Sequence, residues 1–248
     1  MTLAPVLRAL DTDGFAVVRG ALTAGEMARV AAAFDRLEAQ ARRIAAGEPE
    51  PEGASFVLDP DPFRLHRVVW AGGADADLAA LGAHPAFLRL AAASLGSPEV
   101  VQIIQQAHFK LPGDEVAFGW HQDASNRRYG TPLWNDRDGQ GTYVQIGLAV
   151  DPMTLENGPL RMVRGSHRLG FVADPETGEI PGLPDLPIDD VLLEPGDLAV
   201  FGPFVIHGSG PNRSSVPRRL FLQGYTLPGV NHRVYPGCGT GVVHRVAA

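Results

Sequence analysis

From residue 100 onward, the chain contains short runs of β-branched and aromatic residues that end at Pro, Gly, Asn or Asp. Such residues fit the pleated, half-buried surface of a sheet, and the frequent turn residues favour many short strands. A series of this kind predicts a double-sheet β-barrel or jelly roll. The expected strands are 100–111, 142–151, 160–163, 191–193, 198–201 and 218–226.

The first hundred residues have a mixed pattern. Thr23 and Glu26 have the spacing of a capping box, and apolar residues then recur at steps of three and four, so a helix with one apolar face is expected. Gly96 is a stop signal for a second helix. The predicted elements are a strand at 15–18, a first helix that contains 27–44, a surface loop at 47–62 and a second helix at 85–95.

The chain of 248 residues is expected to fold as a single α+β domain that is mainly β. It contains neither an internal repeat nor a low-complexity tract. The predicted parts are a helical and mixed N-terminal part at 1–99, a double-stranded β-helix (a jelly-roll, cupin-like core) at 100–230, and a C-terminal tail at 231–248.

Charge and composition favour a small-molecule partner. The 28 acidic and 21 basic residues give a net charge of -7, which disfavours a broad nucleic-acid-binding surface. No apolar run approaches the roughly 18 residues of a membrane span, so no membrane association is expected. The N-terminus lacks a signal-peptide pattern and the single Cys238 cannot form an internal disulfide, which together predict a cytoplasmic protein. The oligomeric state is left open.

The segment Gly119-Trp120-His121-Gln122-Asp123 holds two side chains that can ligate a metal. On an extended strand, His121 and Asp123 point to the same face, so they can bind one ion together. A third ligand must come from elsewhere, and His207 follows an apolar run and precedes a Gly-rich turn. Two imidazoles and one carboxylate form the facial triad typical of iron(II) oxygenases.

An arginine that follows His207 in the sequence is a candidate ligand for a carboxylate. Arg218 begins a predicted strand eleven residues after His207. The adjacent Arg219 is the competing candidate, because neighbouring strand residues face opposite sides and only one of the two can enter the barrel. Arginine suits bidentate binding of a carboxylate, and a dicarboxylate that binds the metal at one end needs such a contact at the other. Ser209 offers a hydroxyl to the same carboxylate.

In this order the motifs resemble the phytanoyl-CoA dioxygenase-like family of iron(II)/2-oxoglutarate-dependent oxygenases. The resemblance extends over nearly the whole chain, and its motifs are 13–20, 110–113, 121–123, 156–160, 165–167, His207, Ser209 and Arg218. It implies that His121, Asp123 and His207 are catalytic iron ligands, and that Arg218 and Ser209 hold the distal carboxylate of 2-oxoglutarate. It also implies Fe(II), 2-oxoglutarate and dioxygen as cofactor and cosubstrates, with succinate and carbon dioxide as products and hydroxylation as the default outcome.

Further polar residues are candidates for the cavity wall. Gln106, His108 and Lys110 share one face of a predicted strand by its two-residue period. Gln106 is similar to a family position near 2-oxoglutarate. Gln145, in a neighbouring apolar strand, is expected to approach 2-oxoglutarate from that strand, so both are assigned to cosubstrate binding. His108 is assigned to substrate binding. The alternative for each is a buried polar group that is merely hydrogen-bonded.

The segment 124–141 follows the metal motif directly. Long loops in compact domains are often lids, so we expect it to cover the substrate, with Tyr129 and Trp134 in contact with it. The alternative is an ordinary surface connection. Asn157, in contrast, is expected to be structural, because it lies in a turn motif. The resemblance implies the same for His167, whose family counterpart lies in a tight turn and is not a metal ligand.

Two other activities fit part of this pattern. In related halogenases a small residue replaces the carboxylate ligand, whereas Asp123 is present here. A non-oxygenase metal-binding cupin-like protein, such as an isomerase or a ligand sensor, is the main alternative, because a fold does not by itself imply a function. Arg218 argues against it, since such a protein needs no contact for a dicarboxylate. The sequence predicts neither the substrate nor the position of its oxidation.

Overall fold

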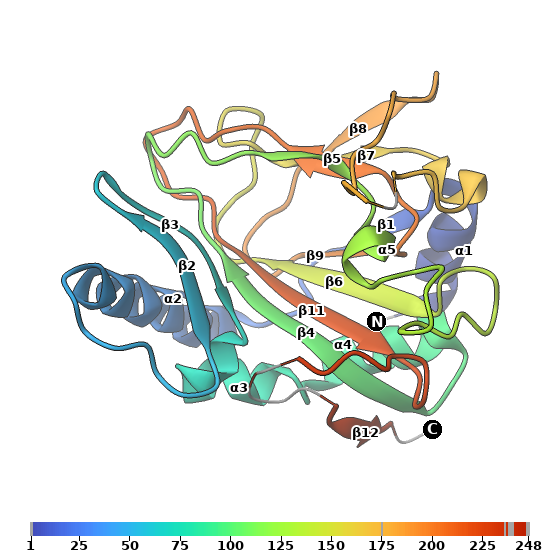
Figure 1. Cartoon of the computed structure of the whole chain (residues 1–248), viewed down its shortest axis with the longest axis horizontal. Coiled ribbons are helices and arrows are strands. Elements are labelled where there is room, and N and C mark those ends of the chain that lie inside the picture. The colour runs from blue at the N-terminus through green and yellow to red at the C-terminus, as the bar shows by residue number, and fades with distance from the viewer. Residues whose placement is uncertain (1, 175, 236, 238–240, 247–248) are drawn as a thin grey trace.

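The computed structural model describes residues 2–174, 176–235, 237 and 241–246, which form two antiparallel sheets that face each other (Figure 1). The larger sheet has the strand order β1-β9-β6-β11-β4-β3-β2, with β12 also paired to β4, and the smaller sheet has the order β5-β10-β7-β8. This arrangement confirms the predicted jelly-roll class. Cys238 lies outside the described residues.

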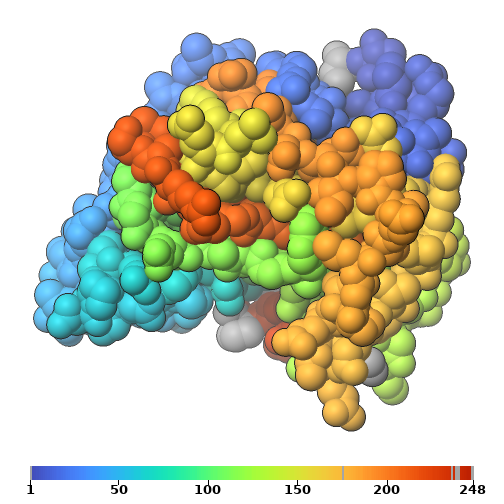
Figure 2. Space-filling model, turned by 90° about the horizontal axis from the view of Figure 1, so that it is seen from above, coloured from blue at the N-terminus to red at the C-terminus, as the bar shows by residue number. Residues whose placement is uncertain are grey.

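The strands of the larger sheet are β1 (Phe15–Val18), β2 (Ser55–Pro60), β3 (Phe63–Val69), β4 (Glu99–His108), β6 (Tyr143–Ala149), β9 (Leu198–Phe201), β11 (Leu220–Thr226) and β12 (Val243–Arg245). Those of the smaller sheet are β5 (Phe118–His121), β7 (Leu160–Val163), β8 (Ile188–Val191) and β10 (His207–Ser209). Figure 2 views the molecule from the side of the smaller sheet, whose segments appear mainly in green, yellow and orange.

Helices pack against the outer side of the larger sheet (Figure 1). Phe34 is fully buried there, with its ring centroid 5.1 Å from that of Phe109 and 6.1 Å from that of Phe221. The helices are α1 (Leu3–Asp13), α2 (Ala24–Ala45), α3 (Ala76–Leu81) and α4 (Pro85–Leu95), and shorter helical segments lie at η1 (Ala71–Gly73), α5 (Asp123–Asn126) and η2 (Ser166–Leu169).

The two-residue period of the strands separates the core from the site. In β6, Val144, Ile146 and Leu148 belong to the core between sheet and helices, whereas Gln145 lines a cavity between the two sheets. One strand therefore contributes both to the apolar core and to a polar cavity wall.

Two predicted helices are confirmed. The Thr23 side chain accepts a hydrogen bond from the Glu26 backbone N–H, and Glu26 Oε2 accepts one from Thr23 N at 2.7 Å, so the capping box begins α2. The helix α4 ends at Gly96, whose φ of 62° is left-handed. The helices α1 and α3 were not predicted.

The predicted loop at 47–62 is wrong in its second half. Residues 55–60 form β2, which pairs with β3 and extends the larger sheet. The Gly, Pro and acidic residues around this run suggested a loop, but Phe56 is buried and the neighbouring strand supplies the hydrogen bonds. The predicted strand 191–193 is likewise shifted to 188–191.

By length and composition alone, residues 76–95 would suffice to cross a membrane. In the structure they form two helices, α3 and α4, separated by 82–84. The side chains of Leu78, Phe87 and Leu90 are buried in the core. This segment is thus a pair of core helices.

Candidate active site

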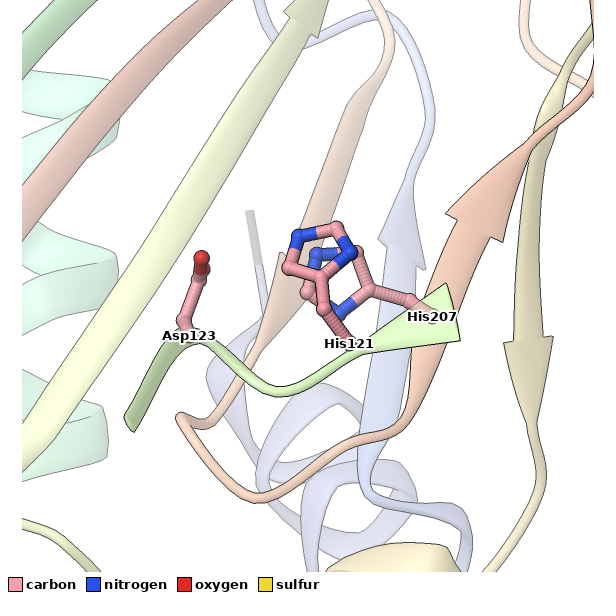
Figure 3. A group of neighbouring side chains, drawn as sticks. All are labelled: His121, Asp123 and His207. Atoms are coloured by element: carbon pink, nitrogen blue, oxygen red, sulfur yellow. The ribbon is translucent and has the colours of Figure 1, made fainter. Parts of the chain in front are cut away.

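Three potential metal ligands lie close together (Figure 3), and all three line the cavity between the sheets. His121 ends β5 and His207 begins β10, and the two residues are direct partners in the antiparallel pair, with ring centroids 4.2 Å apart. Asp123 begins α5 after one further extended residue. One ligand atom from each of the three residues lies within 4.8 Å of the others, so a single ion can contact all three.

Hydrogen bonds fix both imidazoles in an orientation suited to a metal. The Nδ1 of His121 lies 2.8 Å from the carbonyl oxygen of Gly119, and the Nδ1 of His207 lies 2.9 Å from that of Val205. Because a carbonyl oxygen can only accept, each Nδ1 must carry the proton and each Nε2 keeps its lone pair for a metal.

The carboxylate of Asp123 supports the same interpretation. Its Oδ2 is buried and has no hydrogen-bond partner among the described residues. A buried carboxylate oxygen without a partner is costly, and a cation would remove that cost.

Burial, and then the neighbouring His121, lower the pKa of His207 to about 4, so this ring is neutral at pH 7, as a metal ligand must be. The donor set therefore fits an iron(II) ion.

Gln122, between two of these ligands, is a functional residue that the sequence did not reveal. It is fully buried, and its Nε2 donates to the carbonyl oxygens of Gly170 at 2.8 Å and Phe204 at 2.6 Å. Its Oε1 accepts from the backbone N–H groups of Val172 at 2.8 Å and Ala173 at 3.1 Å. Gln122 thus ties the ligand-bearing segment to two other parts of the chain.

The cavity between the sheets joins the triad to Arg218. Its wall is partly polar and partly apolar, and is formed by His108, Phe118, His121, Asp123, Gln145, Leu160, Phe201, His207, Gly208, Ser209, Arg218, Leu220 and Leu222. Besides His121 and Asp123, five predicted site residues line this cavity: His108, Gln145, His207, Ser209 and Arg218. They come from β4, β6, β10 and the residues just before β11.

Arg218 is 1% exposed and has no carboxylate within ion-pair distance among the described residues. Its Nε and Nη2 donate to the carbonyl oxygen of Gly158 at 3.1 and 2.9 Å, and its Nη2 also donates to Ser209 Oγ at 3.2 Å. Burial lowers the pKa of Arg218 to about 10, which leaves it charged at pH 7. A buried guanidinium that lacks an anionic partner is suited to bind one.

Arg219 points the other way. It pairs with Asp151 at 2.8 Å and with Asp35 on α2 at 2.6 Å, and it is absent from the cavity wall. Adjacent strand residues face opposite sides, so only one of the two arginines can enter the cavity, and in this structure it is Arg218.

The remaining predicted residues differ in their placement. His108 and Gln145 line the cavity, while Gln106 stands behind His108, its Oε1 2.9 Å from His108 Nε2. Tyr129 and Trp134 do not line the cavity wall.

Trp134 is instead an anchor of its loop. It is 6% exposed, its Nε1 donates to the carbonyl oxygen of Gly141 at 2.9 Å, and it packs in a cluster with Ile103 and Val230. Direct contact of Trp134 with a substrate is therefore not supported. The aromatic type suggested a substrate contact, but the long-range packing that buries the ring could not be read from the sequence.

The two residues expected to be structural have structural contacts. Asn157 Oδ1 accepts from Thr154 N at 2.8 Å within its turn. The Nε2 of His167 lies 3.0 Å from the carbonyl oxygen of Asp11, at the end of α1.

Comparisons with known proteins identify the family of this chain. The profile of the family "Phytanoyl-CoA dioxygenase (PhyH)" matches residues 10–220. The L-proline trans-4-hydroxylase of Streptomyces griseoviridis is 35% identical over 92 residues, which is 36% of this chain and 31% of that protein. The match thus spans about a third of the length of this curated relative.

Solved structures share the fold. EvdMO1 is 26% identical with a TM-score of 0.71, and the match covers 92% of this chain and 50% of that one. The epimerase SnoN, solved with Fe3+, alpha ketoglutarate and nogalamycin RO, is 21% identical with a TM-score of 0.69, and the match covers 96% of this chain and 94% of that one, a likeness of fold alone. Since the family profile covers most of the residues, from α1 to the start of β11, this chain belongs to the phytanoyl-CoA dioxygenase family.

Proposed function

We propose that the chain is a non-haem iron(II)- and 2-oxoglutarate-dependent dioxygenase that oxidises, and by default hydroxylates, a small molecule. The observation that carries this proposal is that one cavity wall contains both kinds of group. It includes the three neighbouring metal ligands His121, Asp123 and His207, and also the buried Arg218, which has no carboxylate partner among the described residues.

In this proposal His121, Asp123 and His207 hold Fe(II) on one face of the ion and leave its other coordination positions open. When bound, Fe(II) would supply the chemistry that reduces dioxygen with 2-oxoglutarate as the electron donor, giving succinate and carbon dioxide. Arg218 and Ser209 hold the distal carboxylate of 2-oxoglutarate, and so fix its other end towards the metal.

The apolar part of the wall has its own task. Phe118, Phe201, Leu220 and Leu222 line the cavity beside the polar groups. Such side chains exclude water, which strengthens the electrostatic contacts inside and protects a reactive centre from side reactions. His108 and Gln145 are the polar wall residues left to orient 2-oxoglutarate or the substrate.

The substrate proposed here is a small metabolite rather than a macromolecule. The net charge of -7 disfavours nucleic acid, and the similar L-proline trans-4-hydroxylase acts on an amino acid. The identity of the metabolite and the position of oxidation are open to a screen.

Two measurements test the function. Anaerobic addition of Fe(II) and then 2-oxoglutarate should produce a weak visible charge-transfer band, and aerobic incubation with a panel of small metabolites should release succinate. Iron binding without any response to 2-oxoglutarate would instead support the non-oxygenase alternative, a metal-binding isomerase or ligand sensor.

A further inference from the structure

Lys110 lies directly behind the proposed carboxylate subsite. It follows β4 and is 0% exposed. Its backbone exchanges two hydrogen bonds with Arg218, Lys110 N to Arg218 O at 3.2 Å and Arg218 N to Lys110 O at 3.0 Å, so the two residues are directly opposite each other. Directly opposite residues point to the same face of a sheet, which brings two basic side chains together in the protein interior.

Both side chains meet at Ser209. Its Oγ accepts from Lys110 Nζ at 2.7 Å and from Arg218 Nη2 at 3.2 Å. A hydroxyl oxygen has two lone pairs and one hydrogen, so a serine that accepts twice has only its own O–H left to give. Ser209 lines the cavity, where a ligand carboxylate can accept that hydrogen.

The hydrogen bonds of Lys110 suit an uncharged amine. Nζ has two acceptors among the described residues, Ser209 Oγ and the carbonyl oxygen of Gly210. An amine has two hydrogens to donate, whereas an ammonium has three. For the third, the described residues offer no oxygen acceptor, only the ring of Phe118, whose centroid lies 5.5 Å from Nζ. Burial, and then Arg218, lower the pKa of Lys110 to about 6, in agreement with this count.

The charged groups around Lys110 supply no counter-ion. Arg218 from the β11 side and Arg67 from β3 are cations, and burial, followed by Arg67, Arg218 and Lys110, lowers the pKa of His108. Asp151 is paired with Arg219, and the Asp114 carboxylate accepts from Leu111 N at 2.9 Å. Among the described residues, neither carboxylate is within ion-pair distance of Lys110.

The residue type adds an independent argument. The chain has 21 basic residues, and Lys110 is its one lysine; the other twenty are arginines. Arginine stays protonated in proteins, whereas a buried lysine readily gains and loses its proton. The single lysine thus lies beside a second buried cation, Arg218, where a side chain that can lose its charge avoids repulsion.

We propose that Lys110 is a positioning residue of the carboxylate subsite, which orients the Ser209 hydroxyl towards the distal carboxylate of 2-oxoglutarate and takes up one proton from solvent when that anion binds. This inference rests on the proposed function. In the empty site a neutral amine avoids repulsion with Arg218. In the filled site the carboxylate offsets the charge, so the ammonium becomes the favoured form.

Affinity for 2-oxoglutarate should therefore depend on pH with a defined sign. Above the pKa of about 6, the free protein must gain a proton to bind, so binding weakens as pH rises from 6 to 8, by roughly tenfold per pH unit. Below about 6 the amine is already protonated and this dependence disappears. The Lys110→Met variant should lack the dependence and bind roughly tenfold to a hundredfold more weakly at pH 6.

The single lysine allows a direct measurement. With carbon-13-labelled lysine, the protein has one lysine side-chain signal, which can be followed by NMR in the full chain loaded with Zn(II), a diamagnetic substitute for Fe(II). We expect its titration midpoint near 6 without 2-oxoglutarate and above 8 with saturating 2-oxoglutarate. This measurement needs no variant, so it stands even if Lys110→Met fails to fold.

The outcomes separate this inference from the function on which it rests. Binding of 2-oxoglutarate with an unchanged lysine midpoint, or a pH dependence that persists in Lys110→Met, would overturn the role of Lys110 alone. Failure of the wild-type protein to bind 2-oxoglutarate at any pH would overturn the proposed function, and the inference with it.

Discussion

The three triad side chains have no substitute among the other cavity residues, because His121, Asp123 and His207 form the one such group found in the described part of the chain. We expect His121→Ala, Asp123→Ala and His207→Ala each to lose Fe(II) binding and turnover. Their fold should persist, because the core packing lies elsewhere. Calorimetric Fe(II) titration and circular dichroism check this. Full iron-dependent activity in any one variant would remove that residue from the site.

At the same scale, the two adjacent arginines should behave differently. Arg218→Ala leaves a bound carboxylate without its buried partner, which costs about 3 to 5 kcal/mol, or a loss of at least a hundredfold in affinity for 2-oxoglutarate. Arg219→Ala is the matched control, because its partners Asp35 and Asp151 lie outside the cavity. Apparent affinities of the two variants decide the matter. If Arg219 were the sensitive position, the strand register would be wrong by one residue.

Gln122 offers a test of how the ligands are held. Gln122→Ala removes four hydrogen bonds to backbone groups and should weaken Fe(II) binding by about 10- to 100-fold, since residues that position ligands have effects of this size. The exposed Gln140→Ala is the control. Equal Fe(II) affinities in both variants would show that the ligand positions do not depend on Gln122.

At the scale of elements, the loop after α5 is joined to the segment that follows β11. Asn135 N donates to Val230 O at 2.8 Å, His232 N to Leu133 O at 2.9 Å, and Arg137 Nη2 to Pro228 O at 2.6 Å. These contacts make the loop a packed part of the structure, whatever its role towards a substrate.

We therefore expect Trp134→Ala to lower the free energy of unfolding by about 3 to 5 kcal/mol, as removal of a buried tryptophan does. The neighbouring Leu133 is 41% exposed, and Leu133→Ala should change stability by less than about 0.5 kcal/mol. Chemical denaturation of the two variants measures both. A wild-type stability for Trp134→Ala would show that the indole is not an anchor of the loop.

At the scale of the whole molecule, metal binding should stabilise the folded state, because the three ligands come from β5, α5 and β10 and meet in the native fold. Fe(II) at a hundred times its Kd contributes about 2.7 kcal/mol, which for a domain of this size raises Tm by roughly 5 to 10 °C. Anaerobic thermal unfolding with Fe(II) and with a chelator checks this. An identical Tm in both conditions would contradict an intact three-ligand site.

The sequence by itself determined much of the fold and the candidate ligands. Local signals suffice where hydrogen bonds are local, as in the Thr23–Glu26 capping box, or where an apolar run is bounded by turn residues, as in β6 and β9. His121, Asp123 and His207 could be named from residue type and order because their chemistry requires those types.

Other features depended on contacts between residues far apart in the sequence, and only the tertiary structure decided them. The burial of Trp134 and the meeting of Lys110 with Ser209 each follow from which strands become neighbours. Pairing of β2 with β3 likewise overrode a composition typical of a loop. The intrinsic secondary-structure propensity of a residue contributes less to the fold than burial and cross-strand pairing. The residues that complete the site could therefore be identified only from the arrangement of the two sheets.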